Sequence, residues 1–181
     1  MANICDVSLI ARGFKTKEEI DRFAKILDQE NRDNELWMPY FDVYSEIDYD
    51  SNTITAEGWC KWSADRILDE YILEVKDDNP NITSLEELSV IFGVDIEILA
   101  TECGCNVGEH FLIEDGEVSF AEYFDYAEYE AFDSYEEFVE ENGDVIDRET
   151  WASCDEDWIS VGEPETPFGI LQGREYDRLA E

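Results

Sequence analysis

The sequence has no Lys or Arg between Lys76 and Arg148, a stretch of 71 residues that contains 22 Asp and Glu. Phe, Tyr, Ile and Val are interleaved with these acids. A disordered acidic tail is poor in aromatic and branched side chains, because it buries no core. We therefore predict that the stretch folds and holds its carboxylates at fixed positions on a surface.

The sequence also lacks the segments that direct a chain into or across a membrane. It has no run of 18 apolar residues, and residues 1–5 have neither the basic nor the apolar region of a signal peptide. Its five Cys are an odd number in a chain without an export signal, which favours reduced thiols over a disulfide framework. We expect a cytoplasmic location.

Motifs of the common enzyme classes are missing as well. There is no Gly-rich phosphate loop, no dinucleotide fingerprint and no Gly-x-Ser-x-Gly elbow. His110 is the only His in the sequence, and we expect a neutral, hydrogen-bonded, structural role for it. We predict a protein that is not an enzyme and has no cofactor.

Two short patterns resemble metal sites. Cys103, Cys105 and His110 offer three zinc ligands, but two thiolates one residue apart do not easily share a tetrahedral centre. Residues 48–52 match the first ligands of a calcium loop, but the Gly and the bidentate Glu that complete such a loop are missing. We expect a β-turn at 48–52 and no metal. A metal-dependent enzyme that uses the two thiols and His110 remains an alternative.

What the chain has in excess is negative charge. Its 48 acids and 12 bases give a formal charge of -36, where a small soluble domain needs about 2 to 8 charges. A folded monomer of this size exposes about 9,000 Å² of surface, so its average density is about one net negative charge per 250 Å². The surface of B-DNA carries about one negative charge per 110 Å². Residues 101–181 have 25 acids and 3 bases, which favours a directed acidic surface over the even spread expected of a halophile.

The periodicities predict an α+β fold. The expected strands lie at 4–11, 40–47, 53–59 and 94–101, with a hairpin over 111–120 joined by Asp115 and Gly116. One expected helix begins at a capping box at Thr16, a second covers residues 64–75, and a third begins at a capping box at Ser84. A further capping box begins at Ser134. Trp59 and Trp62 are predicted to anchor the core.

The order of these elements predicts the architecture. Strand, helix, strand, strand, helix, strand over residues 4–101 is the order of a ferredoxin-like split βαβ antiparallel sheet, here with an added β-hairpin. We expect a ferredoxin-like α+β domain over residues 1–121. An acidic, aromatic-rich C-terminal extension over residues 122–181 is expected to pack on it.

Three stretches carry a resemblance to a known family. Residues 58–63 read GWCKWS, residues 102–104 and 109–111 read ECG and EHF, and residues 115–117 read DGE. Through these motifs residues 4–120 resemble a family of small proteins of phages and other mobile elements that have YubB-like ferredoxin-like domains. The resemblance implies this fold and a bacterial host, and it implies no catalytic residues.

In charge and length the chain also resembles acidic phage proteins that mimic DNA, including anti-restriction proteins and anti-CRISPR proteins that act on Cas9-type effectors. This resemblance implies a non-enzymatic inhibitor that blocks DNA binding or cleavage by a host defence nuclease, with Cas9 and its guide RNA as the expected target. Carboxylates near phosphate spacing would pair with the Arg and Lys of the DNA-binding cleft. The predicted phosphate surrogates are Glu114, Asp115, Glu117, Glu122, Asp125, Glu128, Glu130, Asp133, Glu136, Glu137, Glu140, Glu141 and Asp144.

Two other functions remain open from the sequence. One is an anti-restriction DNA mimic, and the other is an acidic regulatory module that binds a basic replication or recombination protein. All of these hypotheses predict a basic protein surface as the partner. None predicts direct binding to nucleic acid or to a membrane, because both repel a polyanion.

The charge excess predicts that stability increases with salt. Repulsion among the carboxylates destabilises the compact state, and ions screen it within about 10 Å at 0.1 M salt. Thermal melts between about 0.05 M and 1 M NaCl should therefore give a rising midpoint. A midpoint that does not rise with salt would indicate that the carboxylates are already paired with cations.

Overall fold

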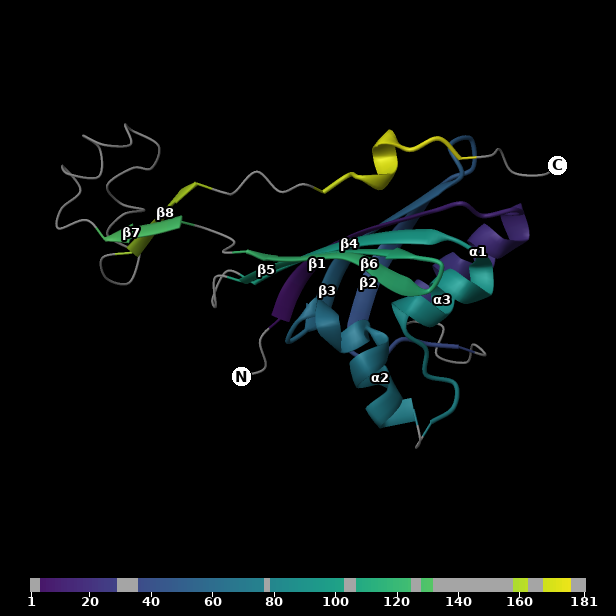
Figure 1. Ribbon diagram of the computed structural model, residues 1–181, viewed down its shortest axis with the longest axis horizontal. Coiled ribbons are helices and arrows are strands. Elements are labelled where there is room, and N and C mark those ends of the chain that lie inside the picture. Colours follow the sequence, from purple (N-terminus) through teal and green to yellow (C-terminus); the bar gives the residue numbers. More distant parts are fainter. Residues whose placement is uncertain are drawn as a thin grey trace. The chain divides into compact units, whose positions relative to one another are not determined.

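The computed structural model describes residues 4–28, 36–76, 79–102, 107–124, 128–131, 158–162 and 168–176 (Figure 1). Their helices and strands are β1 (Ile4–Arg12), α1 (Lys17–Leu27), β2 (Phe41–Asp48), β3 (Thr53–Lys61), η2 (Ala64–Ile67), α2 (Asp69–Lys76), α3 (Leu85–Phe92), β4 (Asp95–Glu102), β5 (Val107–Glu114), β6 (Glu117–Phe124), β7 (Glu128–Ala131), β8 (Trp158–Gly162) and η3 (Leu171–Gly173). The two η elements are 3-10 turns. The predicted α+β class is confirmed. Within the described residues, no helix is long and apolar enough to cross a membrane.

The chain divides into two compact units. The first contains residues 1–124 and 167–181, and the second contains residues 125–166. The stretch from residue 122 that we expected as a C-terminal extension is thus shared between the units. Strands β7 and β8 pair antiparallel within the second unit.

The first unit is built on a six-stranded antiparallel sheet in the order β2-β3-β1-β4-β5-β6. Helix α1 connects β1 to β2, and η2, α2 and α3 connect β3 to β4. Figure 1 shows the helices on one side of the sheet and the yellow segment that contains η3 on the other. The strands β2 and β6 are the two edges of this sheet.

The alternation of side chains along the strands explains these two layers. In β1, Val7 and Leu9 belong to the main core against the helices, whereas Ile10 belongs to a small cluster with Leu112 and Leu171. Successive side chains of a strand point to opposite faces. The sheet is therefore buried on both faces where η3 crosses it, and this explains the continuous apolar run in β1.

Local signals place the ends of two helices. The Thr16 side chain accepts a hydrogen bond from the Glu19 amide, and the Glu19 carboxylate accepts one from the Thr16 amide, so the predicted capping box is confirmed. At α3 the Ser84 hydroxyl accepts from the Glu87 amide at 3.0 Å. Gly93 ends α3 with φ of 62°, a left-handed conformation that Gly adopts without steric cost.

The helix predicted over residues 64–75 is divided into η2 and α2. The first amide of each element donates to a carboxylate that is distant in the sequence. The Ala64 amide donates to Glu109 Oε2 at 2.5 Å, and the Asp69 amide donates to both oxygens of Glu86 at 3.1 Å. Burial raises the pKa of Glu109, and the hydrogen bonds from Ala64 and Ser63 partly offset this rise. Caps that come from other strands and helices leave no local sequence signal.

The prediction that Trp59 and Trp62 anchor the core is wrong, since they are 39% and 43% exposed. Trp62 lies directly after β3 and has a φ of 75°, so its side chain does not follow the alternation of side chains along the strand. Its ring lies 5.4 Å from that of Tyr40 and 4.4 Å from Lys61 Nζ. The fully buried aromatic side chains are instead Phe14, Phe23, Phe41 and Phe111.

We predict that Gly58→Ala destabilises the sheet. A Cβ at this position of β3 would lie 2.2 Å from the Asp42 carbonyl oxygen of β2, which the ladder holds in place. Overpacking of this kind costs about 2 kcal/mol, so the melting midpoint should fall by about 4–8 °C.

The control is Gly173→Ala, because a Cβ at Gly173 meets no atom within 4 Å. Its melting midpoint should stay close to that of the parent protein. Equal midpoints for the two variants would contradict the close packing of β2 on β3.

Candidate functional site

The β5–β6 hairpin presents predicted surrogates at one edge of the sheet. Asp115 and Gly116 form its turn with φ of 52° and 80°, as expected for the Asp-Gly pair of a type I′ turn. Among the described strands, β6 pairs with β5 alone, and its residues from Glu117 to Tyr123 are exposed. We call Asp115, Glu117 and Glu122 the acidic edge.

Ladder pairing places these acids relative to the two faces of the sheet. Glu117 is opposite Glu114, and Glu122 is opposite His110. Residues directly opposite each other in an antiparallel pair point to the same face. Glu114, Glu117 and Glu122 therefore lie on the face that carries His110 and that residues 168–176 cross.

Glu114 is engaged within the molecule. Its carboxylate accepts from Arg174 Nη1 at 2.5 Å and from the Ser119 hydroxyl. The hydrogen bond from Ser119 and the ion pair with Arg174 lower the pKa of Glu114. Glu114 thus contributes to holding Arg174, and its charge is shared with that guanidinium.

The other predicted surrogates lie outside the residues whose side chains the structure describes. They are Asp125, Glu128, Glu130, Asp133, Glu136, Glu137, Glu140, Glu141 and Asp144. Only the backbone of Glu128 and Glu130 is described, in β7.

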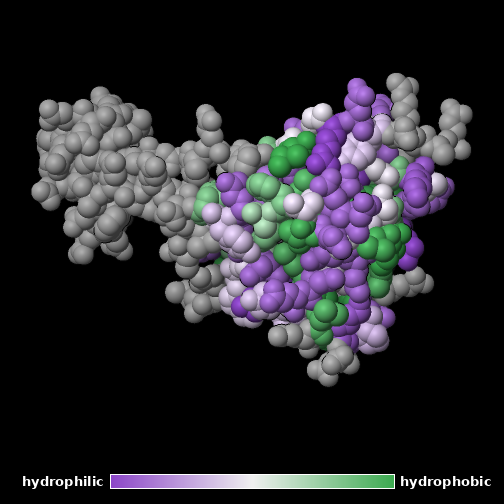
Figure 2. Space-filling model, viewed as in Figure 1, coloured by the Kyte–Doolittle hydropathy of each residue, from purple (hydrophilic) through white to green (hydrophobic). Residues whose placement is uncertain are grey.

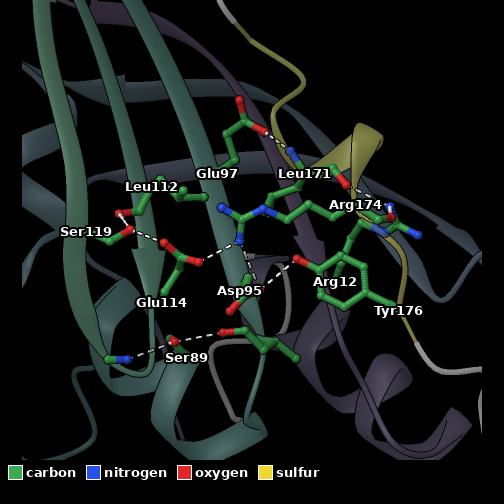
Figure 3. Close-up of polar contacts among 12 residues, drawn as sticks. Arg12, Ser89, Asp95, Glu97, Leu112, Glu114, Ser119, Leu171, Arg174 and Tyr176 are labelled. Carbon is green, nitrogen blue, oxygen red and sulfur yellow. Dashed lines mark hydrogen bonds and ion pairs between the residues drawn. The ribbon is translucent and has the colours of Figure 1, made fainter.

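Residues 168–176, which we call the strap, return to the sheet and are held there by one buried carboxylate. Glu97 Oε1 accepts from the amides of Gly169 at 2.8 Å and Ile170 at 3.0 Å. Its Oε2 accepts from the Leu171 amide at 2.9 Å (Figure 3). His110 Nε2 lies 2.9 Å from Glu97 Oε1. Burial alone would raise the pKa of Glu97, but the hydrogen bonds from His110 and the three amides outweigh burial and lower it.

Further polar contacts fasten the strap along its length. Arg12 Nη1 donates to the carbonyls of Leu171 at 2.7 Å and Arg174 at 2.9 Å. The Tyr176 hydroxyl donates to Asp95 Oδ2 at 2.7 Å, and Figure 3 shows these groups converging from β1, β4, β5 and the strap. Arg174 also lies 3.5 Å from Asp95. No local sequence pattern indicates this network, because its partners are separated by 60 to 162 positions.

The structure places His110 and the expected turn at residues 48–52. His110 is fully buried and paired with Glu97. Asp48 accepts from the amides of Asp50 and Ser51, so the expected β-turn is confirmed. Cys5 and Cys60 are free thiols. In the part of the chain that the structure describes, no group of three metal-binding side chains occurs, and the zinc alternative falls on Cys103 and Cys105, which lie outside that part.

The site is therefore an open edge strand with exposed carboxylates, backed by a strap that is fixed on the sheet. Figure 2 shows that hydrophilic side chains cover much of the visible face of the first unit, with separate apolar patches between them. No protein family, curated protein or solved structure matches this chain. What the arrangement can do chemically is bind cationic groups through the acidic edge.

We predict that Glu97→Gln releases the strap. The amide group keeps the size of the side chain but removes the charge that three backbone amides share, at a cost of about 2 kcal/mol. Hydrogen exchange at Gly169, Ile170 and Leu171 should therefore become about 30-fold faster. The control Glu175→Gln changes an exposed acid of the same segment and should leave exchange unchanged.

The same contact predicts a pH dependence with a defined sign. Because the folded state lowers the pKa of Glu97 below its ordinary 4.5, its stabilising contribution is present above pH 4.5 and is lost as the pH falls through the folded value. Protection of the three strap amides should decrease at acidic pH in the parent protein. The same decrease in Glu97→Gln would show that another group is responsible.

Proposed function

We propose that this chain is a non-enzymatic inhibitor of a host DNA-targeting defence nuclease and acts as a DNA mimic. The proposed target is a Cas9-type effector with its guide RNA, in the cytoplasm of a bacterial host. Such an effector reads a short duplex motif with paired Arg and holds nucleic acid in a positively charged channel. Carboxylates at fixed positions pair with those cations in place of phosphates and block DNA binding or cleavage.

The observation that carries the proposal is the placement of exposed acids on an edge strand of the sheet. Glu117 and Glu122 are exposed on β6, whose turn is fixed to α3 by the hydrogen bond from the Gly116 amide to Ser89 Oγ at 3.1 Å. The chain then enters the second unit, which has 16 acids and one base, Arg148, among its 42 residues. Preorganised charges bind without a large ordering cost.

The carboxylates of the acidic edge are more widely spaced than the phosphates of DNA. Glu117 and Glu122 are five positions apart, which is about 17 Å along a strand. One strand of a DNA duplex has about five phosphates over that length. The acidic edge is therefore too sparse to imitate a duplex without further charge. The acids of residues 125–166 supply it in this proposal.

We further propose that β1 to β4, with α1 and α3, form a ferredoxin-like core, as in phage and mobile-element proteins with YubB-like domains. Support comes from the order β2-β3-β1-β4 with helical connections from β1 to β2 and from β3 to β4. The β5–β6 hairpin extends this core beside β4 and provides the acidic edge.

Charge reversal on the acidic edge tests the proposal. The double variant Glu117→Lys with Glu122→Lys should raise the concentration needed for half-inhibition of DNA cleavage by about tenfold or more. The matched control is Glu46→Lys with Glu57→Lys, which has the same charge change on exposed positions of β2 and β3. The control should inhibit nearly as well as the parent chain. Equal loss in both doubles would point to net charge alone.

A second arm addresses the other unit. Reversing Glu136, Glu137, Glu140 and Glu141 to Lys should abolish inhibition while the melting transition of the first unit is retained. The assay panel contains Cas9-type and restriction nucleases, each with the protein added before or after DNA. Inhibition of restriction nucleases alone would reject the Cas9 target, and inhibition that survives the fourfold reversal would reject DNA mimicry by residues 125–166.

A further inference from the structure

An open pocket of about 320 Å³ lies between α2, α3 and the β5–β6 turn. Leu36, Val90 and Ile91 line it with aliphatic carbon. Val90 and Ile91 are 64% and 49% exposed, so apolar surface faces water at the opening. A partner group with an apolar stem would cover that surface.

Carboxylates dominate the polar lining of the pocket. Asp69, Glu86 and Glu87 line it together with Lys76, the one cation among the described lining residues, which pairs with Glu87. Glu86 is 7% exposed, and both of its oxygens accept from the Asp69 amide. Burial, with a smaller contribution from the charges of Asp69 and Glu87, raises the pKa of Glu86 to about 7. Within the described lining, Lys76 thus pairs with Glu87 and not with the more buried Glu86.

The pocket borders the turn at which β6 begins. Gly116 lines the pocket, and Asp115 and Glu117 flank it in the chain. A Cβ on Gly116 would lie 2.2 Å from Val90 Cγ2, so the turn packs directly on α3. Glu117 and Glu122 lie on the other face of the sheet, so a basic surface borders this pocket only where it binds around the turn at Asp115 and Gly116.

We propose that the pocket is an anchor site for one arginine side chain of the protein partner. The inference rests on the proposed function for its source of arginine, since a DNA-binding cleft presents such side chains. The aliphatic wall accepts the methylene stem, and the guanidinium donates to Glu86 and Asp69. Interface anchors of this kind are buried arginines that fill a pocket near the centre of the contact.

Arginine fits this lining better than lysine. The guanidinium is planar and weakly hydrated, and it donates in a fork that matches a carboxylate. An ammonium is strongly hydrated and would lose more on entering an aliphatic pocket. A bound guanidinium also offsets the cost of burying the Glu86 charge, because the cation takes the place of the lost hydration.

The probe is the peptide acetyl-Gly-Arg-Gly-amide, titrated into isotope-labelled full chain at about 150 mM salt and followed by NMR amide shifts. The expected result is saturable shifts at Asp69, Val90 and Gly116 with a Kd of about 1 mM. The lysine peptide should bind several-fold more weakly. Equal binding of the two peptides, or shifts spread over the whole surface, would overturn the proposal.

A matched pair of variants isolates the pocket from the general negative field. Glu86→Gln keeps an acceptor for the Asp69 amide but removes the charge, and it should weaken arginine-peptide binding about fivefold or more. Glu70→Gln removes an exposed charge of α2 and should have little effect. Similar weakening in both variants would overturn the proposal. Normal peptide binding by a chain that inhibits no nuclease would reject the proposed function and leave the pocket assignment standing.

Discussion

The fold depends on buried carboxylates that are bound by backbone amides. Glu97 accepts from three amides of the strap, Glu109 accepts from the first amide of η2, and Glu86 accepts from the first amide of α2. A buried carboxylate without such donors destabilises a fold by several kcal/mol. With 48 acids and 12 bases, ion pairs are too few for every acid. Backbone amides at the starts of helical turns bind these buried carboxylates in place of basic side chains.

This solution has a structural consequence for the acidic surface. The strap is fixed on the sheet by Glu97 and Arg12, and the hairpin turn is fixed on α3 through Ser89. The acid-rich residues 125–166 therefore begin and end next to elements that are anchored in the first unit. Few bases remain to neutralise exposed carboxylates. The same chain hence combines a core whose buried carboxylates are hydrogen-bonded with exposed carboxylates, which under the proposed function attract a basic partner.

Sequence patterns predicted the parts of this structure that local chemistry determines. The Thr16 capping box and the Asp115-Gly116 turn each depend on a few neighbouring residues, and both are confirmed. The division of the helix after Ile67 was not predictable, because Glu109 and Glu86 act from distant positions. The strap and the engagement of Glu114 by Arg174 were hidden for the same reason. Trp59 and Trp62 were misplaced, because apolar character alone does not say which face of a strand is covered.

The most direct test of the account is equilibrium competition for DNA. Labelled duplex is titrated with a catalytically inactive Cas9-type effector loaded with guide RNA, at increasing fixed concentrations of this chain. If its carboxylates occupy the DNA-binding cleft, the apparent Kd for DNA rises in proportion to the chain's concentration, and the effect weakens as salt is raised. An unchanged Kd for DNA at saturating concentrations of the chain would contradict the account.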